Sequence, residues 1–268
     1  MSVASSPMPR MFMTLPQPNR AFEWTQAPWG PALRCLPLLA AATHFFTGRA
    51  LTLRDDEREW AMVALEMGVA REDVLLVHQV HEATVAVASI DRPRPWPRPR
   101  ADAIVSNDPS AAVAVRIADC VPVLLADETG RAVAAIHAGW RGFARRAIIA
   151  GVGELQTHYG IRPERLTAAV GPSIGPCCYE VSEDTYRSFR DAGHHASVLD
   201  TWFEPRPEGK FHLDLWRASR DQLEGAGVMA DNVHVAGLCT KTHADVFHSY
   251  RVDGADAGRM IGIIRAGV

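Results

Sequence analysis

The sequence lacks the paired cysteines, the long apolar runs and the leader segment that would place it outside the cell or in a membrane. Its 268 residues include five cysteines, an odd number, and two of them are adjacent at 177 and 178, which argues against a disulfide framework. No apolar run is long enough to cross a bilayer, and residues 1–30 lack the charged start and sustained apolar core of a secretory signal. We therefore expect a protein of the reducing cytoplasm with no membrane partner.

A basic patch and an association motif are also missing. The chain carries a formal net charge of −3 at pH 7, and its basic residues are dispersed. The densest basic stretch, RPRPWPRPR at 92–100, alternates with proline and indicates a polyproline II surface loop rather than a nucleic-acid groove. Heptad repeats are absent as well. These absences predict a monomer that does not bind nucleic acid.

The distribution of apolar residues predicts one mixed α/β domain. Hydrophobic residues make up 47% of the chain, enough to bury a large core. We assign residues 1–20 to a disordered or loosely docked tail and 21–268 to the single domain. Apolar runs separated by few turn residues require antiparallel neighbours, so the sheets are expected to be mixed. The expected strands are 42–47, 73–78, 84–90, 103–106, 112–119, 121–126, 131–137, 165–170 and 233–237, and the expected helices are 55–68, 142–159, 182–192 and 213–226.

Three side chains with metal-ligand chemistry follow apolar, strand-like runs. His81 ends DVLLVHQVH, Cys120 ends AVAVRIADC, and His137 lies near the end of RAVAAIHAGW. Each residue alone would be an ordinary core residue. Because strands that end together bring their terminal side chains together, we expect the three to meet. Two imidazoles and one thiolate leave a fourth tetrahedral position open, which is typical of a catalytic rather than a structural metal site.

Five motifs give the chain a resemblance to a known family. HQVHE at 78–82, ADCVPVLLAD at 118–127, IHAGWRG at 136–142, VGPSIGPCCYEV at 170–181 and the tail CT…FHSYRVDG…GR at 239–259 resemble the laccase-domain family, also called the YfiH or polyphenol-oxidase-like family. The resemblance runs from about His44 to Arg259. It implies a single α/β domain with mixed sheets sandwiched between helical layers. It also implies phosphorolysis of purine nucleosides (adenosine, inosine, guanosine and methylthioadenosine) and adenosine deamination.

The expected metal centre consists of His81, Cys120 and His137 holding Zn²⁺ or Cu²⁺, with the metal itself stabilising the thiolate. Water in the open position would ionise near neutral pH, at about 7 in favourable sites. Asp119, directly before Cys120, is a candidate for orienting a histidine ring, and a plain turn residue is the alternative. We expect the catalytic residues to be Cys120, His137, Asp119 and Arg49.

Phosphorolysis requires a cationic cradle for phosphate. The resemblance assigns one arginine, Arg49 of HFFTGR, and two further candidates are Arg141 of HAGWRG and Arg251 of SYR. Guanidinium groups match phosphate oxygens in a two-pronged geometry. A surface salt bridge is the alternative role for each, above all for Arg251. The expected partners are thus a purine nucleoside and phosphate.

Two other chemistries remain open. A multicopper phenol oxidase would require paired histidines, and the 11 histidines of the chain include no His-x-His, although copper at the three-ligand site could still oxidise phenols weakly. The second is a metal-free thiol hydrolase, an amidase or deamidase acting on a peptidoglycan precursor, with Cys120 activated by His137. That mechanism leaves His81 without a role.

Several residues depart from the family pattern, and they are expected to alter loop shape and charge near the pocket rather than the metal ligands. One of them, His248, is expected to be an exposed imidazole or a further ligand at the pocket rim. Adjacent side chains in an extended segment face opposite sides, so we expect Cys177 and Cys178 to be packing thiols, one buried and the other near the rim. The other departures are Glu82, Ala50, Leu51 and Ser219.

Overall fold

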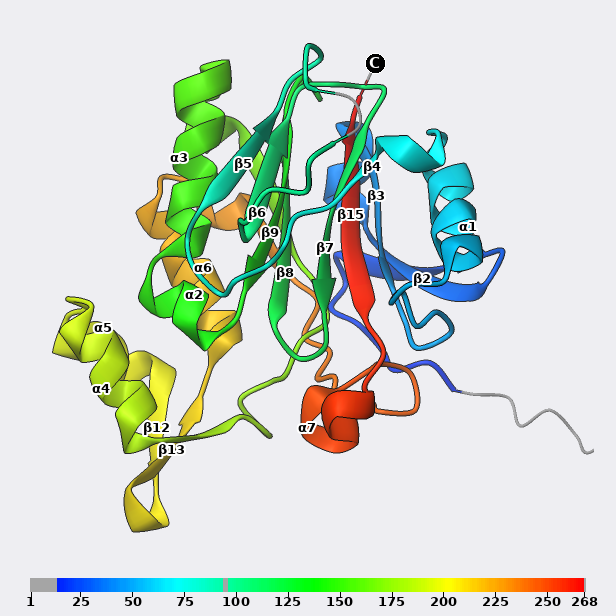
Figure 1. Ribbon diagram of the computed structural model, residues 1–268. Coiled ribbons are helices and arrows are strands. Elements are labelled where there is room, and N and C mark those ends of the chain that lie inside the picture. The colour runs from blue at the N-terminus through cyan, green and yellow to red at the C-terminus, as the bar shows by residue number, and fades with distance from the viewer. Residues whose placement is uncertain (1–13, 94–95, 268) are drawn as a thin grey trace, which may run out of the picture.

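The structure, a computed structural model that describes residues 14–93 and 96–267, stacks two large β-sheets between two layers of helices (Figure 1). Each large sheet has six strands. Separate apolar clusters fill the space between the sheets and the two spaces between each sheet and its helices. The expectation of one α/β domain with mixed sheets between helical layers is therefore confirmed.

The first sheet has the strand order β1-β2-β3-β15-β7-β4. The last strand of the chain, β15, lies in its middle and pairs antiparallel with β3 on one side and β7 on the other (Figure 1). The outer face packs Phe45 and Ile263 against Trp60 and Met67 of helix α1. The bounds are β1 (Phe22–Ala27), β2 (Gly30–Cys35), β3 (Ala42–Thr47), β4 (Val74–Leu75), β7 (Ala112–Ile117), β15 (Met260–Ala266) and α1 (Glu57–Met67).

The second sheet has the order β14-β10-β8-β9-β6-β5 and is covered by α2, α3 and α6 (Figure 1). Its pairs β5–β6 and β10–β14 are parallel and the others antiparallel, so the expected mixed character is confirmed. The bounds are β5 (Val85–Ala88), β6 (Ala103–Ser106), β8 (Val121–Asp127), β9 (Val133–Ala138), β10 (Leu166–Val170), β14 (Val233–Val235), α2 (Trp140–Ala144), α3 (Ala147–Tyr159) and α6 (Leu215–Gly225).

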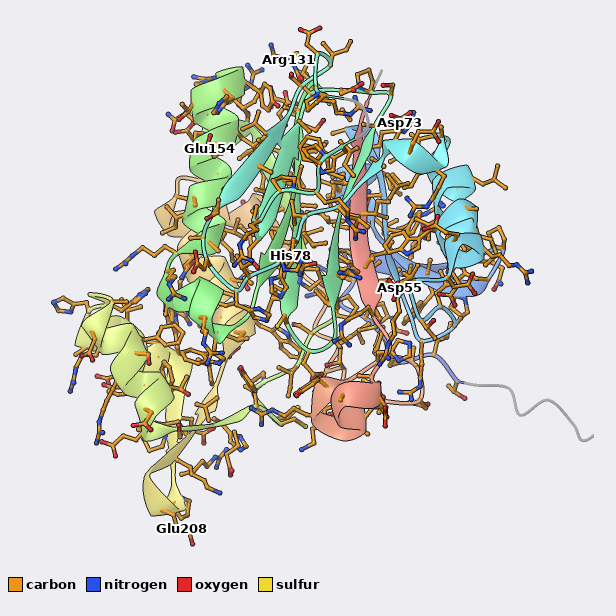
Figure 2. All side chains as sticks on the ribbon, viewed as in Figure 1. Asp55, Asp73, His78, Arg131, Glu154 and Glu208 are labelled. Carbon is orange, nitrogen blue, oxygen red and sulfur yellow. The ribbon has the colours of Figure 1, made fainter. Side chains whose placement is uncertain are left out.

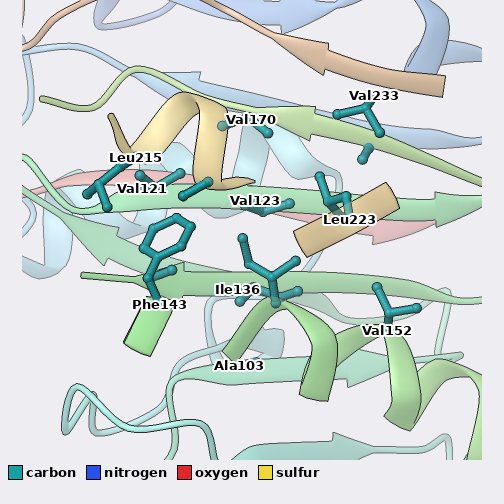
Figure 3. Close-up of a cluster of buried hydrophobic side chains, with 14 of the residues drawn as sticks. Ala103, Val121, Val123, Ile136, Phe143, Val152, Val170, Leu215, Leu223 and Val233 are labelled. Carbon is teal, nitrogen blue, oxygen red and sulfur yellow. The ribbon is translucent and has the colours of Figure 1, made fainter. Parts of the chain in front are cut away.

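Strand β8 shows why this sheet is buried on both faces. Alternate side chains of a strand point to opposite faces, and here both sets are apolar. Val121 and Val123 pack toward the helices, beside Phe143 and Leu223 (Figure 3). Leu124 belongs to the cluster between the two sheets. An apolar run without polar alternation is typical of a strand covered on both sides.

A small sheet of order β11-β13-β12 extends from the helical side of the second sheet (Figure 1). Glu208 marks the tip of its β12–β13 turn (Figure 2). Phe189 and Trp202 join this unit to the main apolar cluster. The bounds are β11 (Glu180–Ser182), β12 (Phe203–Arg206), β13 (Lys210–Leu213), α4 (Glu183–Asp191), α5 (Ala196–Trp202) and, nearer the C-terminus, α7 (Tyr250–Asp253). Short 3₁₀ turns lie at Leu36–Ala40, Arg71–Asp73, Pro163–Arg165, Pro207–Gly209, Ala230–Asn232 and Gly254–Asp256.

Some expected elements differ from the structure. The helix expected at 142–159 is broken, because α2 ends at Ala144 and Arg146 takes a left-handed φ of 61° before α3 begins. The strand expected at 73–78 shrinks to β4, which ends at Leu75. Strands β1, β2 and β15 and the small sheet were not expected. In the described parts of the chain, no helix combines the length and apolar character needed to cross a membrane.

The expected N-terminal tail is described only in part. Residues 1–13 of it lie outside the described residues. Beyond them, the indole N–H of Trp24 donates to the Pro16 carbonyl at 2.8 Å, and the backbone N–H of Asn19 donates to the Ala236 carbonyl at 3.0 Å. These bonds attach the segment just before β1 to the rest of the fold.

Two glycines of α3 provide a matched test of the packing. Alanine has a higher helix propensity than glycine at either position. A Cβ added at Gly153 would have nothing within 4 Å. We therefore expect Gly153→Ala to raise the free energy of unfolding by about 0.5–1 kcal/mol. A Cβ at Gly151 would lie 2.4 Å from Cδ1 of the buried Ile136. Gly151→Ala should therefore lower the free energy of unfolding by about 1–3 kcal/mol. Urea denaturation measures both, and equal effects would contradict the packing of α3 on β9.

Candidate metal centre and cavity

The three candidate ligands meet at one end of the second sheet. His137 lies in β9, and Cys120 immediately precedes the paired strand β8, where Val121 lies opposite Ala138. His81 comes from the connection between β4 and β5. The potential ligand atoms of the three lie within 4.8 Å of one another, and the two imidazole rings are perpendicular, with centroids 4.9 Å apart. The structure therefore brings together the three residues that the sequence singles out.

His81 is positioned by a buried carboxylate rather than by a strand. It lies in a loop with a φ of 61°, so the expectation that it ends a strand is wrong. The Asp102 carboxylate accepts hydrogen bonds from the backbone N–H groups of residues 80–82, at 3.3, 2.9 and 2.7 Å. A buried carboxylate is costly unless it is hydrogen-bonded, so these bonds fix the loop to Asp102.

The same carboxylate orients His137. An Asp102 oxygen lies 2.9 Å from Nδ1 of His137, and the backbone N–H of His137 donates to the Asp102 carbonyl at 2.7 Å. With the Nδ1 proton directed at the carboxylate, Nε2 is left to face the thiol of Cys120. The sequence signal for Asp102, which the sequence analysis missed, is a lone acidic residue directly before the buried run of β6.

Asp119 does not have the histidine-orienting role expected for it. Its carboxylate accepts hydrogen bonds from the Thr240 hydroxyl at 2.6 Å and from the backbone N–H of Arg251 at 2.8 Å. Its own backbone carbonyl accepts from the N–H of Ile174 at 2.9 Å. Asp119 therefore joins three segments beside the candidate centre, and it forms no hydrogen bond to an imidazole among the described residues.

Charge pairing makes Cys120 a thiolate at neutral pH in the absence of metal. Burial alone would raise the pKa of the thiol, but the His137 imidazolium and hydrogen bonds from both histidines lower this pKa to about 6. Burial alone would lower the pKa of His137, but the Cys120 thiolate and the Asp102 carboxylate raise it to about 9. The thiolate is the form that binds a metal or attacks an electrophile.

The donor set fits a metal ion. One thiolate and two imidazoles suit Zn²⁺ and copper alike. The space around them is tight, because a Cβ at Gly139 would lie 3.0 Å from Sγ of Cys120 and 3.2 Å from Cδ2 of His81. Glycine at this position therefore lets the chain pass directly beside the ligands.

The group lies on the wall of a cavity of about 740 Å³, a volume that suits a small-molecule ligand. His78, on the β4–β5 connection, and Asp55, just ahead of α1, belong to the same wall. Five lining residues are arginines, and none of their guanidinium groups forms an ion pair with a carboxylate in the described part of the chain. These arginines are Arg54, Arg116, Arg141, Arg251 and Arg259.

Arg49 lies outside this lining. Its guanidinium donates to the carboxylate of Asp253 at 2.7 Å and to the carbonyls of Ala244 and Phe247 at 3.0 and 3.3 Å. It thereby anchors the segment that carries Arg251 into the cavity. The sequence analysis missed Arg116, whose signal is a single charged residue within the apolar strand β7.

The other two arginines expected from the sequence do line the cavity. Arg141 lies over the ring of Trp140 at 4.2 Å, and Arg251 lies over the ring of Tyr179 at 4.9 Å. Arg251 also donates to the Glu180 carbonyl at 3.0 Å. Stacking on aromatic faces holds each guanidinium in place without neutralising its charge.

Two lesser expectations are wrong. His248 is only 5% exposed, and its Nε2 lies 3.0 Å from the Leu51 carbonyl, so it is neither an exposed imidazole nor a rim ligand. Cys177 is exposed and Cys178 half-buried, and neither lines the cavity. The adjacent thiols lie in a turn rather than in an extended segment, so they are not directed to opposite faces.

A family model described as "Multi-copper polyphenol oxidoreductase laccase" matches residues 54–267. The chain belongs to this family. In the described residues of this family member, two groups of three or more metal-ligating side chains are close enough to share an ion, and neither contains three histidines. The candidate centre is thus a single His/Cys/His group.

Related proteins and solved structures support the assignment to this family. A purine nucleoside phosphorylase from Deinococcus radiodurans is 40% identical over 255 residues, covering 89% of this chain and 94% of that protein. Adenosine deaminase RL5, from an unknown prokaryotic organism, is 34% identical over 211 residues, covering 76% of this chain and 79% of that protein. The crystal structure of YlmD from Geobacillus stearothermophilus matches with a TM-score of 0.81 at 28% identity, covering 91% of this chain and 99% of that one.

The position of Asp102 predicts a strong effect of its charge on metal binding. Asp102→Asn removes an acceptor from the His81 loop and from His137, and we expect it to weaken Zn²⁺ binding by about 10–100-fold. Competition against a chromophoric chelator measures this affinity. Asp119→Asn is the matched control and should leave the affinity close to that of the wild type. Equal losses in the two variants would contradict the assigned roles.

The charge pair predicts an unusual pH dependence for alkylation of the metal-free protein. Because thiolate is the reactive form, Cys120 should react with iodoacetamide with a midpoint at about pH 6. Partial desolvation of the Cys177 sulfur and the neighbouring thiols of Cys178 and Cys239 raise the pKa of Cys177 to about 11, so this thiol should react only in strongly alkaline solution. Peptide mass spectrometry separates the two sites. A Cys120 midpoint near that of an ordinary thiol would show that the ion pair with His137 does not form.

Proposed function

We propose that the chain is a metal-dependent purine nucleoside phosphorylase with an accompanying adenosine deaminase activity. The observation that carries the proposal is one cavity shared by a His/Cys/His group and by arginines without carboxylate partners among the described residues. Relatives named purine nucleoside phosphorylase and adenosine deaminase support it. The proposed substrates are adenosine, inosine, guanosine and methylthioadenosine, with inorganic phosphate as co-substrate.

In this proposal, Zn²⁺ or Cu²⁺ on His81, Cys120 and His137 supplies a Lewis acid that polarises a substrate atom. The protein holds the three ligands in place through Asp102, whose hydrogen bonds reach two of them. Preorganised ligands cost no rearrangement during the reaction.

Arg116 is the proposed centre of the phosphate site. Burial lowers the pKa of Arg116, and the positive charges of Arg98 and Arg259 lower it further. Arg54 and Arg259 lie on the same part of the wall, because both donate to the Ala257 carbonyl at 2.7 Å. A phosphate dianion bound among these guanidinium groups would relieve their mutual repulsion.

The remaining lining suits a nucleoside. Aromatic and apolar side chains offer flat surfaces for the purine and the ribose, as in most small-molecule sites. A phosphate oxygen would form a bond to C1′ of the ribose while the N-glycosidic bond breaks and its electron pair passes to the base. The base takes up the proton that hydrogen phosphate gives up, so the products are the free base and ribose 1-phosphate, or methylthioribose 1-phosphate from methylthioadenosine. These lining side chains are Trp140, Ile174, Tyr179, Leu215 and Tyr250.

The phosphate site predicts a specific kinetic change. We expect Arg116→Ala to raise the KM for phosphate at least about tenfold, since a guanidinium–phosphate pair contributes more than 1.4 kcal/mol, whereas Arg116→Lys should lose less because the charge remains. Arg131→Ala, at an exposed position away from the cavity, is the control. Base release is followed with and without phosphate. Equal rates of base release with and without phosphate would identify hydrolysis and reject the proposed phosphorolysis.

A metal-free amidase or deamidase acting on a peptidoglycan precursor is the second candidate. The thiolate of Cys120, the imidazolium of His137 and the carboxylate of Asp102 form the arrangement of an activated cysteine nucleophile. Chelation separates the two candidates. The phosphorylase should lose activity in a chelator and regain it with Zn²⁺, whereas the thiol enzyme should survive chelation and lose activity only with iodoacetamide.

A further inference from the structure

A second cluster of thiols lies outside the cavity. The sulfur atoms of Cys177, Cys178 and Cys239 all lie within 4.8 Å of one another, and those of the adjacent pair are 3.4 Å apart. The hydroxyl of Thr242 is 3.6 Å from Sγ of Cys177 and 3.5 Å from Sγ of Cys178. None of these four residues lines the cavity.

The fold brings the thiols together from two distant segments. Ser173 and Cys239 form an isolated β-bridge, which places the turn at 176–178 beside the turn after Cys239. A Cβ at Gly175 would lie 2.7 Å from the ring of Trp216 and 3.3 Å from Cβ of Cys239. Glycine at 175 therefore permits this close approach. The N–H of Gly175 also donates to Sγ of Cys239 at 3.3 Å.

We propose that Cys177, Cys178 and Cys239 form a second metal site, which takes one thiophilic ion such as Cu(I) or Zn²⁺. Three sulfur donors with no imidazole or carboxylate in the group select soft ions. An ion about 2.3 Å from each sulfur in tetrahedral geometry requires sulfurs about 3.8 Å apart. The observed spacing reaches this geometry through small side-chain rotations. Cys177 is exposed, so an ion can enter from solvent and the thiol protons can leave.

The site is close enough to the cavity to influence its wall. The turn that carries Cys177 and Cys178 lies between Ile174 and Tyr179, and both of these flanking side chains line the cavity. An ion that joins this turn to Cys239 would hold this part of the cavity wall in place through a contact that lies outside the cavity. This role is separate from that of the His81 group, and it does not depend on which reaction the cavity supports.

The test measures ion binding with the first centre removed. Full-length Cys120→Ala protein, reduced and free of metal, is titrated with Cu(I) under anaerobic conditions against bathocuproine disulfonate, and in a parallel arm with Zn²⁺ against a chromophoric chelator. We expect about one equivalent of at least one ion to bind. The added change Cys177→Ser should abolish this binding. The added change Cys35→Ser, at a buried thiol outside the cluster, should leave it intact.

The choice of variant keeps the result interpretable. Cys177 is exposed, so its change to serine leaves the packed interior untouched, and thermal unfolding verifies that the variant is folded. Failure of the Cys120→Ala protein to bind either ion would overturn the second site, as would equal binding by Cys120→Ala and Cys120→Ala/Cys177→Ser proteins. X-ray absorption should show sulfur as the main donor to the bound ion, and a shell dominated by nitrogen or oxygen would also overturn it. None of these measurements depends on phosphorylase activity.

Discussion

The carboxylate of Asp102 is the interaction on which the candidate centre depends. It joins the loop that carries His81 to the strand that carries His137, through hydrogen bonds to backbone and imidazole donors. Burial by itself would raise the pKa of this carboxyl, but the hydrogen bond from His137 and those from the backbone lower it, so the group remains charged. Without the carboxylate, the backbone donors of the His81 loop and the buried imidazole of His137 would lose their shared acceptor, and an unpaired buried donor costs about 1–3 kcal/mol.

The layers of the fold supply a rigid frame, and the connections supply the chemistry. β8 and β9 are central, paired strands, so the positions of Cys120 and His137 follow from their register. The cavity arginines come from connections, from strand β7 and from the short helices α2 and α7, and several are held by carbonyl groups or aromatic rings rather than by carboxylates. Their positive charge therefore stays available to an anionic ligand.

Local patterns predicted the strands of the second sheet and the ligand trio, while half of the first sheet, the small sheet and the roles that depend on distant contacts escaped prediction. Asp102 matters because of a loop twenty residues earlier and a strand thirty-five residues later. Arg49 matched a family motif, but its guanidinium donates to the carboxylate of Asp253, 204 residues further along the chain. This contact holds Arg49 outside the cavity lining. β15 was missed because Gly262 interrupts its apolar run. In the fold this glycine makes room for Phe46, whose Cε1 would lie 3.0 Å from an added Cβ.

The central place of β15 has a consequence for how the chain folds. β3 and β7 do not pair with each other. Each pairs with β15, which lies between them and follows all the other strands in the described sequence. Until residues 260–266 have been synthesised, both strands present unpaired backbone edges, and open edges of this kind invite association with other chains. The first sheet thus closes late, through contacts of high sequence separation that slow folding. A nascent chain that stalls before β15 would need a chaperone more than the finished protein does.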